Sequence, residues 1–223
     1  MRERGDGMLL REFCAENMER VPAAIGAGAK RIELCDNLAR GGTSPSVGVV
    51  RAAVRLCREH DVALMAMARP RGGDFAYSAD ELQMMDDDIA SHARSGVDGV
   101  VFGCARDGHL DIPATERLLS TAFACAEKPL QVTFHMAFDE ILPEEQLGAI
   151  DWLAEHGVTR ILTHGGPAGT PIEENLPRLR AYVERAAGRI GILPGGGVTW
   201  QNCEELARAL GVSEVHGTKI VEL

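Results

Sequence analysis

The sequence predicts an α/β fold, a TIM-like (β/α) barrel of eight parallel strands in a single domain spanning residues 1–223. Short β-rich runs alternate with segments of helical period along the whole chain. The starts of successive runs lie 22 to 36 residues apart, which leaves room for one strand, one crossover helix and two loops. Eight such units are the number that closes a parallel barrel.

The predicted strands are short runs of apolar residues, and most are followed by polar or glycine-rich loops. In chain order they are residues 9–14, 31–35, 63–68, 99–103, 131–135, 160–165, 190–195 and 214–218.

Helix-end signals separate these strands. Ser44-Pro45 precedes a helical segment at 47–60 and Ser78 precedes another at 79–95, so we expect a serine to cap the free amides at each start. Four helical runs end in a glycine just before the next strand, where a left-handed backbone conformation is expected: Gly28, Gly96, Gly157 and Gly211.

The final helix of such a barrel is expected to be missing or truncated, because only five residues follow Thr218. We therefore expect a bare outer face beside the first and last strands. A second copy of the chain is predicted to cover it, giving a homodimer. The alternative is that the N-terminal arm lies there.

Composition excludes several classes of protein. A formal net charge of −10 opposes a broad nucleic-acid surface, and no apolar segment is long enough to span a membrane. The start of the chain lacks the apolar region of a signal peptide, and six cysteines lie far apart with no zinc-binding spacing. These features predict a cytoplasmic protein with reduced thiols.

Strand parity turns polar side chains into the barrel. In the fifth run the apolar Val132 and Phe134 suit the helix layer, which directs Gln131, Thr133 and His135 inward. By the same parity two pairs face the interior: Glu12 with Cys14, and Glu33 with Cys35.

A buried carboxylate needs a partner or a proton. We expect Arg69 and Arg71, which flank Pro70 after the third strand, and His135 to supply the partners. Two interpretations stand on equal terms: an internal ion-pair network that fixes the barrel register, or a catalytic group at the carboxyl ends of the strands. The other histidines, His92, His109 and His156, have the pattern of surface residues.

The glycine run Gly195, Gly196 and Gly197, together with His216 after strand eight, occupies loops where barrels commonly bind phosphate. A phosphate or another oxyanion is one prediction for this edge. Tight turns with no ligand are the other, and glycine triplets occur more often in that role.

The thiols suggest a different chemistry. Cys14 and Cys35 end adjacent strands and are expected about 5 Å apart, and Met65 and Met67 share the inward parity of strand three. Thiols and thioethers are ligands that Cu(I) accepts. Against this interpretation, buried cysteine and methionine more often serve as apolar packing.

Several motifs together resemble the CutC copper-homeostasis family. They are Glu-Phe-Cys-Ala-Glu-Asn at 12–17, Glu-Leu-Cys-Asp at 33–36, Gly-Gly-Thr-Ser-Pro-Ser at 41–46, Arg-Pro-Arg-Gly-Gly-Asp-Phe at 69–75, Thr-Phe-His at 133–135, Gly-Gly-Gly-Val at 195–198 and Val-His-Gly-Thr at 215–218. The resemblance implies a TIM-like barrel, often dimeric, that handles copper in the cytosol and binds Cu(I) through Cys14 and Cys35. Met136 and His164 stand where many relatives carry Arg and Ser. These two residues would make the carboxyl end of the barrel better suited to a soft metal ion than to an anion.

Two functions follow. One is a Cu(I)-binding or copper-trafficking protein that uses Cys14 and Cys35 as metal ligands. The other is a barrel enzyme acting on a small anionic substrate, which would be a phosphorylated one if the glycine loops hold phosphate. Its catalytic residues would be Glu12 or Glu33 as acid or base, His135 as the second proton carrier, and Arg69 with Arg71 as oxyanion clamps. A third, lower-ranked hypothesis is a divalent-metal site made of Glu12, Glu33, His135 and Asp139.

Overall fold

The computed structural model describes residues 9–125, 130–167 and 169–223. Each of the eight predicted strands is present, with bounds that differ from the prediction by no more than a few residues. They are β1 (Leu10–Glu16), β2 (Arg31–Cys35), β3 (Ala63–Met67), β4 (Gly99–Phe102), β7 (Gln131–Phe134), β8 (Arg160–Thr163), β9 (Gly191–Pro194) and β10 (Glu214–Gly217).

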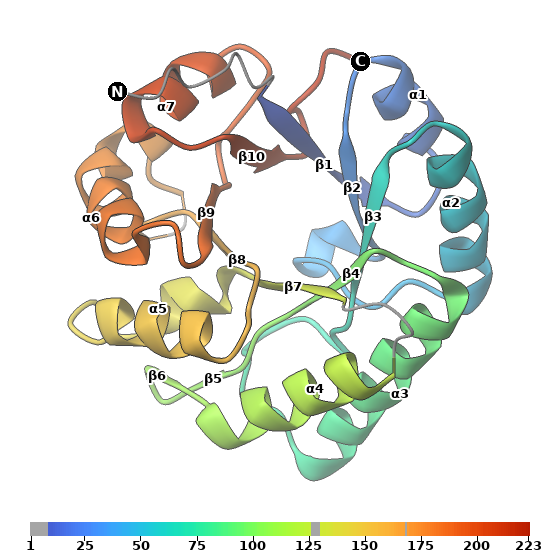
Figure 1. The fold of residues 1–223 in the computed structure, drawn as a ribbon, viewed down its shortest axis with the longest axis horizontal. Helices are drawn as coiled ribbons and strands as arrows, with labels where there is room; N and C mark the ends of the chain where they lie inside the picture. Colours follow the sequence, from blue (N-terminus) through green and yellow to red (C-terminus); the bar gives the residue numbers. More distant parts are fainter. Residues whose placement is uncertain (1–8, 126–129, 168) are drawn as a thin grey trace.

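These strands form one parallel sheet in the order β10-β1-β2-β3-β4-β7-β8-β9. The sheet curls into a nearly closed ring with the helices outside it (Figure 1). Within the described residues β9 and β10, the two ends of the order, share no strand ladder. The predicted TIM-like barrel is confirmed.

The α-helices of the described ranges lie around the ring (Figure 1). They are α1 (Val21–Gly26), α2 (Val47–Glu59), α3 (Ala79–Ser95), α4 (Ile112–Ala124), α5 (Gln146–Glu155), α6 (Leu176–Ala186) and α7 (Cys203–Leu210), with short 3₁₀ helices η1 (Leu38–Arg40), η2 (Met136–Glu140) and η3 (Ile172–Asn175) in the loops.

A small hairpin, β5 (Ala105–Arg106) and β6 (His109–Leu110), follows β4 and was not predicted. Asp107 and Gly108 between its strands both have positive φ, which is the turn chemistry that Asp-Gly favours. The dipeptide was therefore a usable sequence signal.

Helix ends follow the predicted chemistry with one correction. Ser78 and Glu81 form a reciprocal capping box at the start of α3. At α2 the cap is Ser46 rather than Ser44, because the Ser44 hydroxyl is bonded to the backbone of Arg69. The four predicted glycines after the helices all have positive φ: Gly28, Gly96, Gly157 and Gly211.

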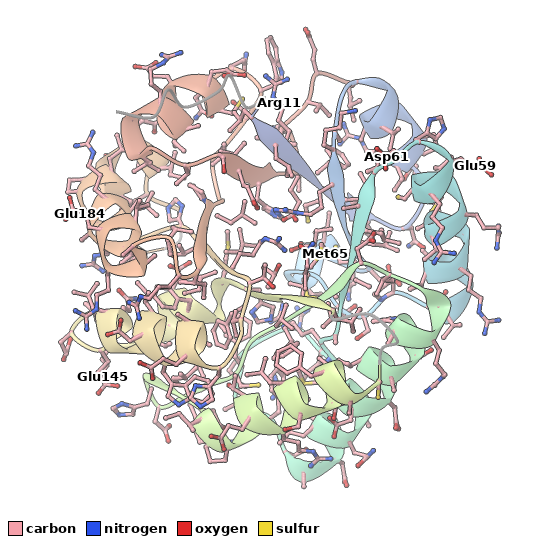
Figure 2. All side chains as sticks on the ribbon, viewed as in Figure 1. Arg11, Glu59, Asp61, Met65, Glu145 and Glu184 are labelled. Carbon is pink, nitrogen blue, oxygen red and sulfur yellow. The ribbon has the colours of Figure 1, made fainter. Side chains whose placement is uncertain are left out.

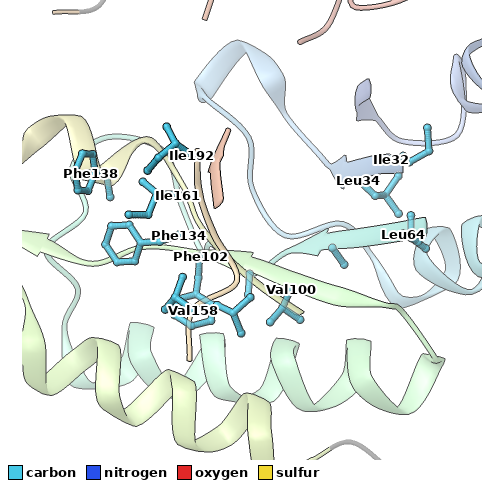
Figure 3. Packing of buried hydrophobic residues seen from close by; sticks show 14 of the residues in the cluster. Ile32, Leu34, Leu64, Val100, Phe102, Phe134, Phe138, Val158, Ile161 and Ile192 are labelled. Carbon is cyan, nitrogen blue, oxygen red and sulfur yellow. The ribbon is translucent and has the colours of Figure 1, made fainter. Parts of the chain in front are cut away.

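Alternation along the strands divides the buried residues into two sets, as parity predicted. Outward side chains such as Phe134 and Ile161 pack together in the layer between sheet and helices (Figure 3). A second apolar cluster of Cys14, Cys35, Met65, Met67 and Val101 lies inside the barrel. Figure 2 shows Met65 near the centre of the ring, whereas Glu59 and Glu184 lie at its periphery.

No helix follows β10 among residues 218–223. The expected bare apolar face is nevertheless wrong, because Phe13 and Val215, the outward residues of β1 and β10, are buried in one core with Ile220 and Val221. The homodimer therefore stays a prediction, because the bare apolar face from which it was inferred is absent among the described residues. The alternative cover, the arm at residues 1–8, lies outside the described residues. No described helix is both long and apolar enough to cross a membrane.

Candidate functional site

A cavity of about 180 Å³ lies at the carboxyl ends of the strands. It brings together six of the residues predicted from the sequence: Cys14, Glu33, Cys35, Arg69, His135 and His216. Met67, Phe75 and Met136 complete much of its apolar wall. We call it the inner cavity.

Glu12 lies fully buried in the barrel, next to the residues of the inner cavity, and belongs to an ion-pair network. Its carboxylate pairs with the Arg31 guanidinium and accepts a hydrogen bond from Nδ1 of His216 at 2.7 Å. Arg31 also contacts Glu214 at 2.7 Å, and Arg160 lies 3.3 Å from the same carboxylate. The predicted partners, Arg69 and His135, do not contact Glu12. Arg31 lies two residues before Glu33 on β2 and therefore faces the same side of the sheet. Strand parity could thus have identified Arg31 as a partner of Glu12.

The network holds Glu12 ionised. Burial alone would raise the pKa of Glu12, but the hydrogen bond with His216 and the charge of Arg31 outweigh it and lower the pKa to about 2. His216 responds in the opposite direction: burial lowers its pKa, yet the carboxylates of Glu33 and Glu12 outweigh this and raise it.

His216 is oriented by this contact. With Nδ1 bonded to Glu12, the other nitrogen, Nε2, lies 3.9 Å from Oε1 of Glu33. Ligand atoms of Cys14, Glu33 and His216 all lie within 4.8 Å of one another, the one such cluster among the described residues. A carboxylate behind a histidine is the usual second-layer contact of a metal ligand.

The two predicted thiol ligands are offset along the strands. Cys14 lies opposite Glu33, whereas Cys35 lies opposite Glu16. The strand spacing of ~4.8 Å and rise of ~3.3 Å per residue then separate their Cα atoms by about 8 Å instead of about 5 Å. The two side chains nevertheless belong to the same apolar cluster inside the barrel, and both line the inner cavity. Hydrogen bonding with Cys35 is the largest cause that raises the pKa of Cys14 well above its ordinary value.

Both thiols also donate hydrogen bonds inside the barrel. The Cys14 thiol donates to Oε1 of Glu33 at 3.3 Å, and burial and the charge of Glu33 also raise its pKa. The Cys35 thiol donates to the carbonyl of Ala15 at 3.4 Å. Burial raises the pKa of Glu33 as well.

Arg69 and His135 form the opposite side of the inner cavity. Arg69 donates to the carbonyl oxygens of Gly41 at 2.9 Å and Gly73 at 2.7 Å, which ties together the loops after β2 and β3. Burial and the charge of Arg69 lower the pKa of His135 to about 3, so its ring is neutral. Both residues stand next to the Phe75 ring.

Arg71 does not reach the inner cavity. Its side chain turns to the outside and pairs with Asp74 at 3.0 Å and Glu81 at 2.5 Å. The prediction that Arg71 acts with Arg69 as a clamp is wrong, because two carboxylates beside the β3–α3 loop already bind it. The prediction that His92 lies at the surface is wrong as well. The residue is buried, and its Nε2 lies 3.0 Å from the Met67 carbonyl oxygen.

A larger outer pocket of about 500 Å³ adjoins the inner cavity through shared residues Phe75 and Met136. Gly196, Gly197 and His164 line it together with Asp139 and Glu140. None of the described residues that line it is Lys or Arg, so it lacks the cations typical of a phosphate site.

The glycines of this loop serve close packing. A side chain at Gly195 would lie 2.6 Å from Leu162, and one at Gly196 would lie 2.9 Å from Nδ1 of His164. The Gly195 amide is also committed to the carbonyl of Thr163. These contacts favour the tight-turn interpretation over an oxyanion cradle.

The proposed divalent-metal set is not assembled. Asp139 accepts hydrogen bonds from Thr163 and from the amide of His164 at 2.9 Å, and it lines the outer pocket. Glu12 is committed to Arg31 and His216, so the four predicted oxygen and nitrogen ligands do not share one centre.

Comparison with known proteins assigns the family. Residues 9–221 match the CutC family. The chain belongs to the CutC family. A CutC family protein of Enterococcus faecalis is 52% identical over 214 residues, which are 96% of this chain and 100% of that protein. The human protein named copper homeostasis protein cutC homolog is 38% identical over 208 residues, covering 93% of this chain and 72% of that protein.

Solved structures agree with the CutC assignment. A CutC structure from Streptococcus agalactiae superposes with a TM-score of 0.91 at 43% identity, covering 96% of this chain and 100% of that one. Deoxyribose phosphate aldolase from Aeropyrum pernix superposes with a TM-score of 0.69 at 12% identity, covering 94% of this chain and 86% of that one. The second likeness shows the barrel fold alone, and the resemblance to CutC is confirmed.

Proposed function

We propose that this CutC family member binds Cu(I) in the inner cavity as a carrier in copper homeostasis. Cys14 and His216 are the central ligands, and Cys35 is the second thiol. The observation that carries the proposal is the convergence of Cys14, Glu33 and His216 within 4.8 Å, with Glu12 fixing the histidine.

The chemistry of the donors favours a soft ion. Thiolate and imidazole suit Cu(I), and Met67 and Met136 surround them with thioether and apolar surface. A copper ion displaces the thiol proton of Cys14, and Glu33, which already accepts that hydrogen bond, is placed to pass the proton on to solvent. The low exposure of Cys14, 7%, would shield the bound ion from water.

The proposal also places the protein in the cytosol, where thiols remain reduced. All six cysteines are free in the structure, and five of them are buried. A homodimer is part of the same proposal, and light scattering over a range of concentrations tests it.

The decisive experiment is a Cu(I) titration of the reduced protein against a competing chelator. Because Cys125 is exposed and would bind copper unspecifically, all variants carry Cys125→Ser. Cys14→Ser and His216→Asn are expected to weaken Cu(I) binding by at least tenfold each, and Cys35→Ser by a smaller factor.

Cys57→Ser is the matched control, since Cys57 is a buried thiol on α2 in the layer between sheet and helices. Unchanged affinity in both Cys14→Ser and Cys35→Ser would refute the thiol site. X-ray absorption of the loaded protein supplies a second readout, in which sulfur and nitrogen neighbours of copper are expected together.

A further inference from the structure

Arg69 is a buried cation without a described carboxylate partner. The residue is 4% exposed, and the hydrogen bonds that its terminal nitrogens donate within the described chain go to the carbonyl oxygens of Gly41, Gly42 and Gly73. Its Nε has no hydrogen-bond partner among the residues that the structure describes. Neutral carbonyl dipoles position the guanidinium but do not neutralise it, so an anion beside it would be favoured.

His135 contributes a second free donor. Its Nδ1 accepts a hydrogen bond from the Ala137 amide at 3.2 Å, which fixes the proton of the neutral ring on Nε2. That Nε2 has no partner among the described residues. His135 is 4% exposed and lines the inner cavity.

The Phe75 ring contacts both donor residues, and all three line the inner cavity. The Arg69 guanidinium carbon lies 4.6 Å from the centre of the Phe75 ring, and the His135 ring centre lies 5.0 Å from it. Gly103 leaves the space that His135 occupies, because a side chain there would lie 2.6 Å from Nδ1. The His135 ring is therefore closely packed against Gly103.

Glu33 supplies the third unpartnered group of the same cavity. Its Oε1 receives the Cys14 thiol, while Oε2 is buried with no described partner. A hydroxyl group both donates and accepts, so it suits this carboxyl oxygen in either protonation state.

Cavity size limits the ligand. A volume of about 180 Å³ corresponds to about six water molecules at ~30 Å³ each. A molecule of comparable size with one carboxylate and one hydroxyl fits this volume and the three free groups.

We propose that the inner cavity has a binding site for a small hydroxycarboxylate, with the carboxylate on Arg69 and His135 and the hydroxyl on Glu33. The site shares Glu33 with the proposed copper site, whereas Arg69 and His135 are not among the proposed copper ligands. It gives the cavity a second ligand class, a small organic acid.

The test uses the metal-free, reduced full chain and three probes of nearly equal size: lactate, propionate and 1,2-propanediol. Saturation-transfer NMR and calorimetry are expected to show saturable binding of lactate. Propionate lacks the hydroxyl and should bind roughly tenfold more weakly, the equivalent of about 1.4 kcal/mol. Propanediol lacks the carboxylate and should bind weakest. Equal affinity for the three probes, or no saturable lactate binding, would overturn the proposal.

His135→Asn tests the donor directly, because asparagine can retain the cap on the Ala137 amide while removing Nε2–H. His109→Asn, the same change at an exposed histidine of the β5–β6 hairpin, is the matched control. Lactate affinity should fall in the first variant alone. If His135→Asn does not fold, the Nε2–H resonance of the unaltered protein decides, since lactate must shift it and propanediol must not.

The same measurements on Cys14→Ser separate this site from the copper proposal. That variant removes the thiol ligand and leaves Arg69, His135 and Glu33 in place. Lactate binding that survives in it, together with lost Cu(I) binding, supports both proposals. Lost lactate binding with retained Cu(I) binding would refute the hydroxycarboxylate site alone.

Discussion

Replacing Glu12 with glutamine should destabilise the protein severely, because it leaves Arg31 and His216 in the barrel without their shared anion. The pKa of Glu12 falls from an ordinary 4.5 to about 2, and at about 1.4 kcal/mol per unit this corresponds to about 3 kcal/mol of stabilisation near neutral pH. Breaking a buried ion pair by removing one partner costs a similar 3–5 kcal/mol.

The pH dependence follows from the sign of the shift. A carboxyl group whose pKa is lowered on folding stabilises the protein above its unfolded value of 4.5, and this contribution disappears as the pH falls towards 2. Urea unfolding should therefore show a much lower free energy of unfolding for Glu12→Gln than for the unaltered protein near neutral pH. This difference should become smaller as the pH falls below 4.5.

Glu204→Gln provides the control. Glu204 pairs with Arg11 at 2.7 Å, but its side chain is 58% exposed, so its loss should cost no more than about 1 kcal/mol. If Glu12→Gln unfolds at the same urea concentration as the unaltered protein, or if its deficit is unchanged in acid, the reasoning about the ion network is wrong.

Two further predictions concern the inner cavity. Gly103→Ala should destabilise the protein by about 1–3 kcal/mol in thermal unfolding, because the new side chain would lie 2.6 Å from the His135 ring. The control is Gly148→Ala on α5, where a new side chain would meet no atom within 4 Å and should not destabilise the protein. Cu(I) affinity should rise with pH, by about tenfold per unit if one proton leaves, because the pKa of Cys14 is raised. Chelator competition at several pH values measures this, and a flat profile would contradict thiolate ligation.

The polar interior of the barrel satisfies both interpretations that the sequence left open, in different places. Glu12, Arg31, Arg160 and Glu214 form the internal network that the ion-pair interpretation expected. The inner cavity instead contains groups that have no hydrogen-bond partner in the described part of the chain, among them Oε2 of Glu33 and Nε2 of His135. His216 connects the two, with one ring nitrogen in each.

The sequence by itself determined the barrel and the direction of its side chains. Strand spacing sets the number of βα units, and the period of two decides which residues face inward, as Phe13 and Cys14 show on β1. Local chemistry at Ser78 and at the helix-ending glycines was equally readable, because capping involves only neighbouring residues.

Only the tertiary structure decided which inward groups meet. The stagger between β1 and β2 sets Cys14 opposite Glu33 rather than Cys35, and the contact of β1 with β10 brings His216 to Glu12 across 204 positions of sequence. Arg69 and Arg71 look equivalent along the chain, yet one is buried and the other binds surface carboxylates. Such pairings depend on the relative shift of neighbouring strands and on loop paths, which a period along one strand does not encode.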